Sequence, residues 1–297
     1  MYKSFDDLRI KISALKRTLV VAAAHDKHTL EAVLTAADKF NIKFILTGDR
    51  KEIKSLSSQL GYRLNDDIIH DGKNEAECAE IAVSLIKNGF ADALMKGLTD
   101  TGTLLKAVLD KNSGIRDSGT LSHLAILETP GYHKLIGITD GGMIPTPSFE
   151  QKVDIIKNAA GFFKRIGYQK PKIAALCASE SVSPKIIETV EAAELQELCR
   201  KGGLGDCLLE GPLSFDIAVS KESADIKGFK SEISGEADIL LVPNYTVGNV
   251  LAKGLIYCAG AKMAGIILGA KVPIILTSRC ASAEEKLLSI MLGILGG

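Results

Sequence analysis

The stretch 18–48, TLVVAAAHDKHTLEAVLTAADKFNIKFILTG, decides the fold class. Residues 18–24 and 43–48 are short apolar runs, which is typical of strands buried on both faces. Between them, residues 28–40 place apolar side chains at helical spacing. A buried strand, a helix and a second buried strand in this order predict a parallel βαβ unit.

The same alternation of strand and helix continues along the chain. A turn at Pro130-Gly131 lies between stretches at 121–127 and 134–139 that look like strands, so these two strands are expected to form a hairpin. We therefore predict an α/β protein with mainly parallel sheets. Further strands are expected at 67–70, 91–95, 172–178, 207–210, 237–243, 265–269 and 272–277, and helices at 49–60, 74–87, 149–166, 184–200, 247–259 and 282–295.

Composition excludes several classes of protein. The chain has 297 residues with 36 basic and 36 acidic side chains, and this neutral balance argues against a general nucleic-acid binder. The longest apolar run, 264–276, is interrupted by Lys271 and Pro273, so no membrane span is expected. The N-terminus has no signal-peptide core, and the six cysteines show no C-x-x-C spacing. We expect a cytoplasmic protein with reduced thiols.

Residues 96–103, KGLTDTGT, follow an expected strand and open an expected helix. A helix N-terminus offers free backbone N–H groups to an anion. Thr99 and Thr101 add hydroxyl donors, while Lys96 and Lys106 add positive charge. The segment is a candidate phosphate loop, and an ordinary capped turn is the alternative.

Three other strand ends carry polar residues. Asp140 follows an expected strand, where a functional carboxylate or a turn residue would lie. Asn244 and Asn249 flank a helix start, where they would bind a ligand or cap the helix. Ser278 and Arg279 precede an expected helix. Together, the hydroxyl, the positive charge and the helix N-terminus favour binding of an oxyanion or a phosphate there.

No metal site is expected. His25 and His28 have ligand-like spacing, but no third ligand lies nearby in the sequence. The chain also lacks the G-x-G-x-x-G fingerprint, so a nicotinamide cofactor has no support.

An ordered set of motifs resembles the phosphate acetyl/butyryltransferase family, and most of all its butyryl-type members. The resemblance runs from about Thr18 to Leu295 and is strongest at the C-terminal end. The motifs are ALMKG (93–97), EGPL (210–213), PNYTVGN (243–249) and LTSR (276–279).

The resemblance implies that acyl-CoA and inorganic phosphate react reversibly to give acyl phosphate and CoA. It implies a homo-oligomer, dimer or higher, with CoA as substrate and no tightly bound cofactor. It also implies two α/β domains like those of isocitrate and isopropylmalate dehydrogenases, with an active-site cleft between them. The expected first domain is 1–145 plus 273–297, and the second is 146–272.

The resemblance also implies roles for individual residues. Arg279 and Ser278 would stabilise the oxyanion, and Glu285 would be the catalytic base, with Glu284 an open alternative. Acetyl-type relatives have Asp at the position of Glu285 and Arg at the position of Lys106. The residues expected to bind CoA or phosphate are Lys96, Gly97, Thr99, Thr101, Lys106, Arg116, Asp140, Asn244, Gly248 and Asn249.

Two alternatives to a butyryl-type enzyme remain open, and a third has no support in the sequence. One is a phosphate acetyltransferase, because a hydrophobic pocket separates acyl groups by only about 1–3 kcal/mol per methylene. Another is a non-catalytic acyl-CoA-binding module of the same fold. A dehydrogenase would need a metal-binding carboxylate cluster and a cofactor loop, and the sequence shows neither.

Overall fold

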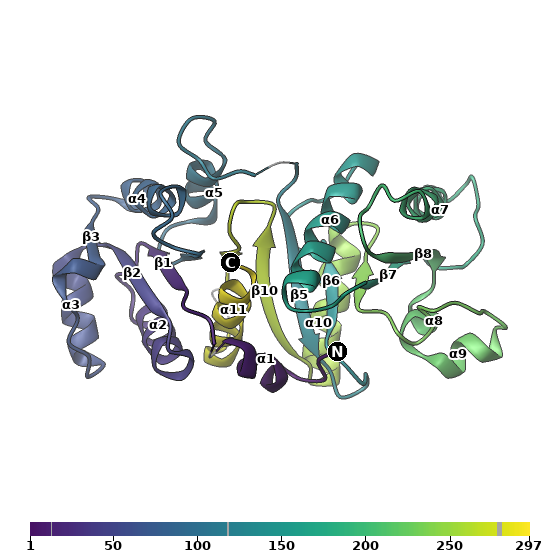
Figure 1. The fold of residues 1–297 in the computed structure, drawn as a ribbon, viewed down its shortest axis with the longest axis horizontal. Helices are drawn as coiled ribbons and strands as arrows, with labels where there is room; N and C mark the ends of the chain where they lie inside the picture. The colour runs from purple at the N-terminus through teal and green to yellow at the C-terminus, as the bar shows by residue number, and fades with distance from the viewer. Residues whose placement is uncertain (13, 118, 278–280) are drawn as a thin grey trace. The chain divides into compact units, whose positions relative to one another are not determined.

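A computed structural model describes residues 1–297 except 13, 118 and 278–280. It confirms the predicted α/β class, with strands and helices alternating along most of the chain (Figure 1). The chain divides into two compact units. The first unit comprises Met1–Phe5 and Gly119–Met263, and the second comprises Asp6–Ser118 and Ala264–Gly297.

The second unit contains the stretch that decides the fold. Its strands run in the order β3-β2-β1-β4-β11-β10. Neighbours are parallel except for β10 and β11, which are antiparallel. The strands are β1 (Thr18–Ala22), β2 (Lys43–Gly48), β3 (Ile69–Asp71), β4 (Ala93–Lys96), β10 (Lys262–Leu268) and β11 (Ile274–Ile275), and the helices are α1 (Phe5–Ile12), α2 (Lys27–Phe40), α3 (Arg50–Gln59), η1 (Asp66–Ile68), α4 (Glu75–Lys87), α5 (Thr101–Leu109) and α11 (Ala283–Gly296).

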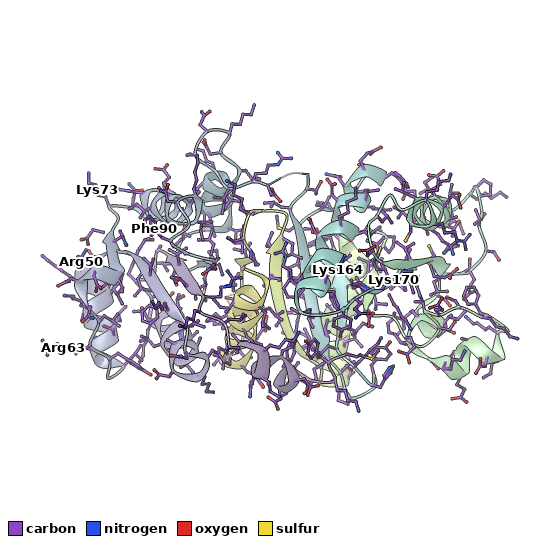
Figure 2. All side chains as sticks on the ribbon, viewed as in Figure 1. Arg50, Arg63, Lys73, Phe90, Lys164 and Lys170 are labelled. Atoms are coloured by element: carbon purple, nitrogen blue, oxygen red, sulfur yellow. The ribbon has the colours of Figure 1, made fainter. Side chains whose placement is uncertain are left out.

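Burial explains why these segments fold as they do. Every residue from Leu19 to Ala24 is fully buried, as expected for a central parallel strand. Helices α4 and α5 pack together, while α2 packs against α3 and α11. Figure 1 shows α4–α5 and α2 on opposite sides of β1 and β2. Arg50, which Figure 2 labels, lies at the edge of the sheet. It forms ion pairs with Asp66 at 3.0 Å and with Asp71 at 2.7 Å.

The first unit has strand order β5-β6-β9-β7-β8. Strands β5 and β6 form the predicted antiparallel hairpin, and the other pairs are parallel. The strands are β5 (Ser122–Glu128), β6 (Ile136–Thr139), β7 (Lys172–Leu176), β8 (Leu208–Leu213) and β9 (Ile239–Leu241), and the helices are α6 (Phe149–Arg165), α7 (Ile187–Arg200), α8 (Phe215–Val219), α9 (Lys221–Ile226) and α10 (Tyr245–Ala259).

Two helices cover the hairpin. Successive side chains of a strand point to opposite faces of the sheet. A Cβ added at Gly137 would lie 3.1 Å from Phe163 of α6. The next residue, Ile138, shares a cavity wall with Ala252 of α10. Helices α6 and α10 therefore pack on opposite faces of β6.

A buried ion pair joins the starts of the parallel strands in the first unit. Lys134 is fully buried, and its Nζ lies 2.6 Å from Asp238 Oδ1. The same ammonium donates to the carbonyl oxygen of Glu236 at 2.8 Å. The other oxygen of Asp238 accepts the backbone N–H of Lys172 at 2.8 Å. One carboxylate thus ties together the segments that open β6, β7 and β9.

The compact units divide the chain at positions other than the expected domain boundaries. The units change at 5/6, 118/119 and 263/264, whereas the resemblance implied domain boundaries at 145/146 and 272/273. The hairpin accounts for most of this difference, because β6 pairs with β9 and so joins the residues that follow it. Three short α-helices, α1, α8 and α9, and the 3₁₀ helix η1 were not predicted. No helix in the described part of the chain has the length and hydrophobicity of a membrane span.

Candidate functional site

Asp140 lies directly after β6 and is 2% exposed. Its Oδ1 accepts the backbone N–H groups of Gly142 at 2.7 Å and Met143 at 2.8 Å. These bonds fit the predicted turn role of the carboxylate. Its Oδ2 is buried and has no hydrogen-bond partner among the described residues. One oxygen of the carboxylate therefore fixes the loop between β6 and α6. The other oxygen is available to accept a hydrogen bond inside the protein.

His123 lies beside this loop, although it was not among the predicted site residues. Because β5 is antiparallel to β6, the first residues of β5 lie at the same edge as the last residues of β6. The hydroxyl of Thr139 donates to the carbonyl oxygen of His123 at 2.8 Å. A Cβ added at Gly142 would lie 2.7 Å from the imidazole Cγ, so the loop packs directly on the ring.

The imidazole of His123 is held neutral at physiological pH. Burial lowers its pKa, and the negative charge of Asp140 only partly opposes this effect. Its Nδ1 is buried and, like Asp140 Oδ2, has no partner among the described residues. A histidine within the predicted strand 121–127, which is otherwise apolar except for Ser122, was the available sequence signal.

The N-terminus of α10 packs against the same loop. Asn244 caps the helix, because its side chain accepts the backbone N–H of Val247 at 3.1 Å. A Cβ added at Gly248 would lie 2.7 Å from Gly141 Cα, so the two backbones touch. The Nδ2 of Asn249 donates to the carbonyl oxygen of Gly141 at 3.4 Å. The structure thus brings four predicted residues into one region of the first unit: Asp140, Asn244, Gly248 and Asn249.

The predicted phosphate loop lies in the second unit, where β4 ends. Lys96 is half-buried, and its Nζ donates to the carbonyl oxygens of Gly97 at 3.0 Å and Thr99 at 2.9 Å. A Cβ at Gly97 would lie 2.2 Å from the carbonyl oxygen of Ala23. Only glycine therefore fits this close approach to the end of β1.

The start of α5 is capped by a side chain of this loop. Asp100 accepts the backbone N–H of Thr103 at 2.9 Å and also contacts the Thr103 hydroxyl. These bonds lower the pKa of the Asp100 carboxyl. They also pair one of the free backbone N–H groups at the start of α5. Thr99 is fully buried, whereas Thr101 is exposed. In the structure this segment is therefore a capped turn, as the alternative expected. An anion bound here would have to share the N–H groups of the helix start with Asp100.

The remaining predicted residues of the second unit lie at its surface or in α11. Lys106 and Arg116 are exposed. Glu285 is half-buried in the first turn of α11, and its backbone N–H donates to Ser282 Oγ at 3.0 Å. Burial raises the pKa of the Glu285 carboxyl above its ordinary value. Glu284 is exposed.

Ser278 and Arg279 lie outside the described residues. Among the residues that are described, no group of three or more histidine, cysteine or acidic side chains has the geometry of a metal site.

Comparisons with known proteins agree with the motif resemblance. The sequence model of the family described as phosphate acetyl/butaryl transferase matches residues 73–294. Phosphate butyryltransferase of Clostridium acetobutylicum is 39% identical over 296 residues, covering 99% of this chain and 98% of the relative. Phosphate acetyltransferase of Thermotoga maritima is 38% identical over 276 residues, covering 93% and 94%.

A solved structure supports the same assignment. The branched-chain phosphotransacylase from Enterococcus faecalis is 32% identical and superposes with a TM-score of 0.82, covering 94% of this chain and 98% of that one. Both the sequence and the fold match over nearly the whole chain, and the chain therefore belongs to the phosphate acetyl/butyryltransferase family.

Proposed function

We propose that this phosphate acyltransferase catalyses the reversible reaction of a short-chain acyl-CoA with inorganic phosphate to give acyl phosphate and CoA, with butyryl-CoA as its preferred substrate. The observation that carries the proposal is the 39% identity, over 99% of the chain, to a phosphate butyryltransferase. The protein would act in the cytoplasm as a homo-oligomer. Acyl-CoA serves as a substrate, and no tightly bound cofactor takes part.

In the forward direction, a phosphate oxygen attacks the thioester carbonyl carbon and the C–S bond breaks. Holding the two substrates together supplies a large part of the rate, because the step becomes effectively unimolecular. Negative charge develops on the carbonyl oxygen, and Arg279 stabilises it through the two parallel donors of the guanidinium group. Ser278 donates to the same oxygen or to the departing sulfur. CoA leaves as a thiolate.

The reverse direction needs a base that removes the proton from the CoA thiol. Glu285 is the better candidate, because burial raises the pKa of its carboxyl toward the working pH. Glu284 is exposed, so it lacks the burial that favours Glu285 as the base.

The anionic substrates require positive charge and hydrogen-bond donors. Exposed Lys106 and Arg116 contribute charge toward CoA phosphates, and Thr101 contributes a hydroxyl at the start of α5. Lys96 donates hydrogen bonds to two backbone carbonyl oxygens, so it holds the shape of the loop. Its positive charge also attracts the anionic substrates. Four further residues contribute mainly by positioning backbone: Gly97, Thr99, Asn244 and Gly248.

A phosphate acetyltransferase is the second candidate function. It is favoured by the 38% identity to the acetyltransferase of Thermotoga maritima over 93% of the chain. The two activities differ only in acyl preference and would overlap.

The test is release of the CoA thiol from acetyl-, butyryl- and isobutyryl-CoA, measured with and without phosphate. We expect release only with phosphate, and fastest from butyryl-CoA. Fastest release from acetyl-CoA would favour the second candidate. Release that ignores phosphate would refute the phosphotransacylase reaction, and binding of acyl-CoA with no release would indicate a non-catalytic module.

A further inference from the structure

A small cavity lies between the hairpin and α10 in the first unit. Its volume is about 80 Å³. Its apolar walls come from β5, β6, α10 and the end of the first unit at Met263, and they consist of Ala125, Ile138, Ala252, Ile256 and Met263.

The cavity borders the loop and the helix start described above. Gly141, Gly248 and Asn249 line it together with the apolar residues. Lys253 also lines it and is itself exposed. The cavity is therefore an apolar recess next to the residues that the sequence assigned to substrate binding.

The volume fits a short aliphatic chain. An apolar cavity of roughly 150 Å³ takes up benzene, which corresponds to about 25 Å³ per carbon. At that ratio, 80 Å³ accommodates about three carbons. A butyryl group carries three carbons beyond its carbonyl, and an acetyl group carries one.

We propose that this cavity is the acyl pocket and that it selects four-carbon acyl groups of acyl-CoA. The assignment rests on the proposed phosphate acyltransferase function and names the residues that set its chain-length preference. The carbons beyond the carbonyl lie against Ala125, Ile138, Ala252 and Met263, and the thioester carbonyl remains at the polar side.

The polar side of the cavity suits a thioester carbonyl. His123 lines the cavity, and burial lowers its pKa, so it presents a neutral ring beside the acyl chain. The amide of Asn249 provides a second donor on α10, where its present acceptor is the carbonyl oxygen of Gly141 at 3.4 Å. A neutral imidazole and an amide recognise an uncharged carbonyl without placing a net charge beside the chain.

Two substitutions test the pocket in opposite directions. Ala252→Leu fills the cavity from the helix side, and Met263→Ala enlarges it. Ala259→Leu is the matched control, because it makes the same change on the same helix at an exposed position that does not line the cavity. Thermal unfolding of each variant confirms that it is folded.

The readout is the ratio of kcat/KM for butyryl-CoA to that for acetyl-CoA in the presence of phosphate. Two methylenes at roughly 0.8 kcal/mol each predict a preference of about 15-fold for butyryl-CoA in the parent protein. Ala252→Leu should abolish this preference while acetyl-CoA turnover persists, and Met263→Ala should raise kcat/KM for hexanoyl-CoA. Ala259→Leu should leave the ratio unchanged. An unchanged ratio in folded Ala252→Leu, or no gain for hexanoyl-CoA in folded Met263→Ala, would overturn the assignment.

A binding measurement separates failure of the pocket from failure of the reaction. Calorimetric titration with the unreactive thioethers S-butyl-CoA and S-methyl-CoA needs no turnover. Tighter binding of S-butyl-CoA by the parent, lost in Ala252→Leu, would support the pocket even if no phosphate-dependent release occurred. Equal Kd values for the two thioethers in the parent would overturn the pocket even if the protein turned over.

Discussion

Two glycines on α10 give a matched pair of substitutions with opposite expected effects. A Cβ at Gly248 would meet Gly141 Cα at 2.7 Å and the carbonyl oxygen of Asp140 at 3.1 Å. Both atoms belong to backbone and cannot turn aside as a flexible side chain would. A Cβ at Gly254 would meet nothing within 4 Å.

The magnitudes follow from helix propensity and packing. Replacing a glycine inside a helix by alanine gains about 0.5–1 kcal/mol, and this is the full effect expected for Gly254→Ala. Gly248→Ala has the same gain but forces a backbone clash that costs about 1–3 kcal/mol. We therefore expect Gly248→Ala to be about 1–3 kcal/mol less stable than Gly254→Ala. The displaced loop also carries Asp140, and a shift of about 1 Å near a reacting centre can lower turnover by about 100-fold.

Urea unfolding followed by circular dichroism measures the stability difference. The chain has two compact units, so the midpoint of each resolved transition is compared rather than one overall free energy. Phosphate-dependent release of CoA measures turnover on the same samples. If Gly248→Ala were as stable as Gly254→Ala and equally active, the close approach of α10 to the loop would constrain neither stability nor turnover.

Three further predictions concern other parts of the molecule. Lys134→Ala leaves Asp238 buried without its cation, so urea unfolding should show a loss of about 3–5 kcal/mol, and a loss below about 1 kcal/mol would contradict the buried pair. The raised pKa of Glu285 means that its carboxylate form is lost as pH falls through that pKa, so the rate of the CoA-consuming direction should fall there. Glu285→Gln should remove this acid limb from the pH profile of kcat/KM, while Glu284→Gln should keep it. The reverse pattern would identify Glu284 as the base. Arg279→Ala should lower kcat for CoA release by about 100-fold, and near-normal turnover would remove this residue from the mechanism.

Much of the fold was predictable because parallel strands buried on both faces read as continuous apolar runs. The run 18–24 became β1 and its flank, and the run 43–48 became β2. Helix α1 was not predicted from the sequence, because four of its eight residues carry charged side chains. This helix is held by burial of Phe5, Leu8 and Ile12, which is a matter of packing rather than of propensity.

The candidate site was predicted less completely, because hydrogen bonds within a loop do not show in residue types. The motif 96–103 has the composition of a phosphate loop, but Asp100 caps α5 and Thr99 is buried. Likewise, Asn244 was assigned to a ligand or a cap, and the structure shows the cap.

The sequence by itself determined the α/β class, the hairpin and the family, since each depends on runs and motifs that are contiguous along the chain. Tertiary structure decided which distant residues meet. The pairing of β6 with β9 placed the hairpin in the first unit. Within the predicted hairpin, the register of β5 on β6 and the packing of the loop on the ring set His123 beside Asp140. The contact of Gly141 with Gly248 set α10 against that loop, and so formed the recess that we assign to the acyl chain. The β6–β9 pairing and the Gly141–Gly248 contact join segments that are distant along the chain, and such packing is not specified by residue types alone.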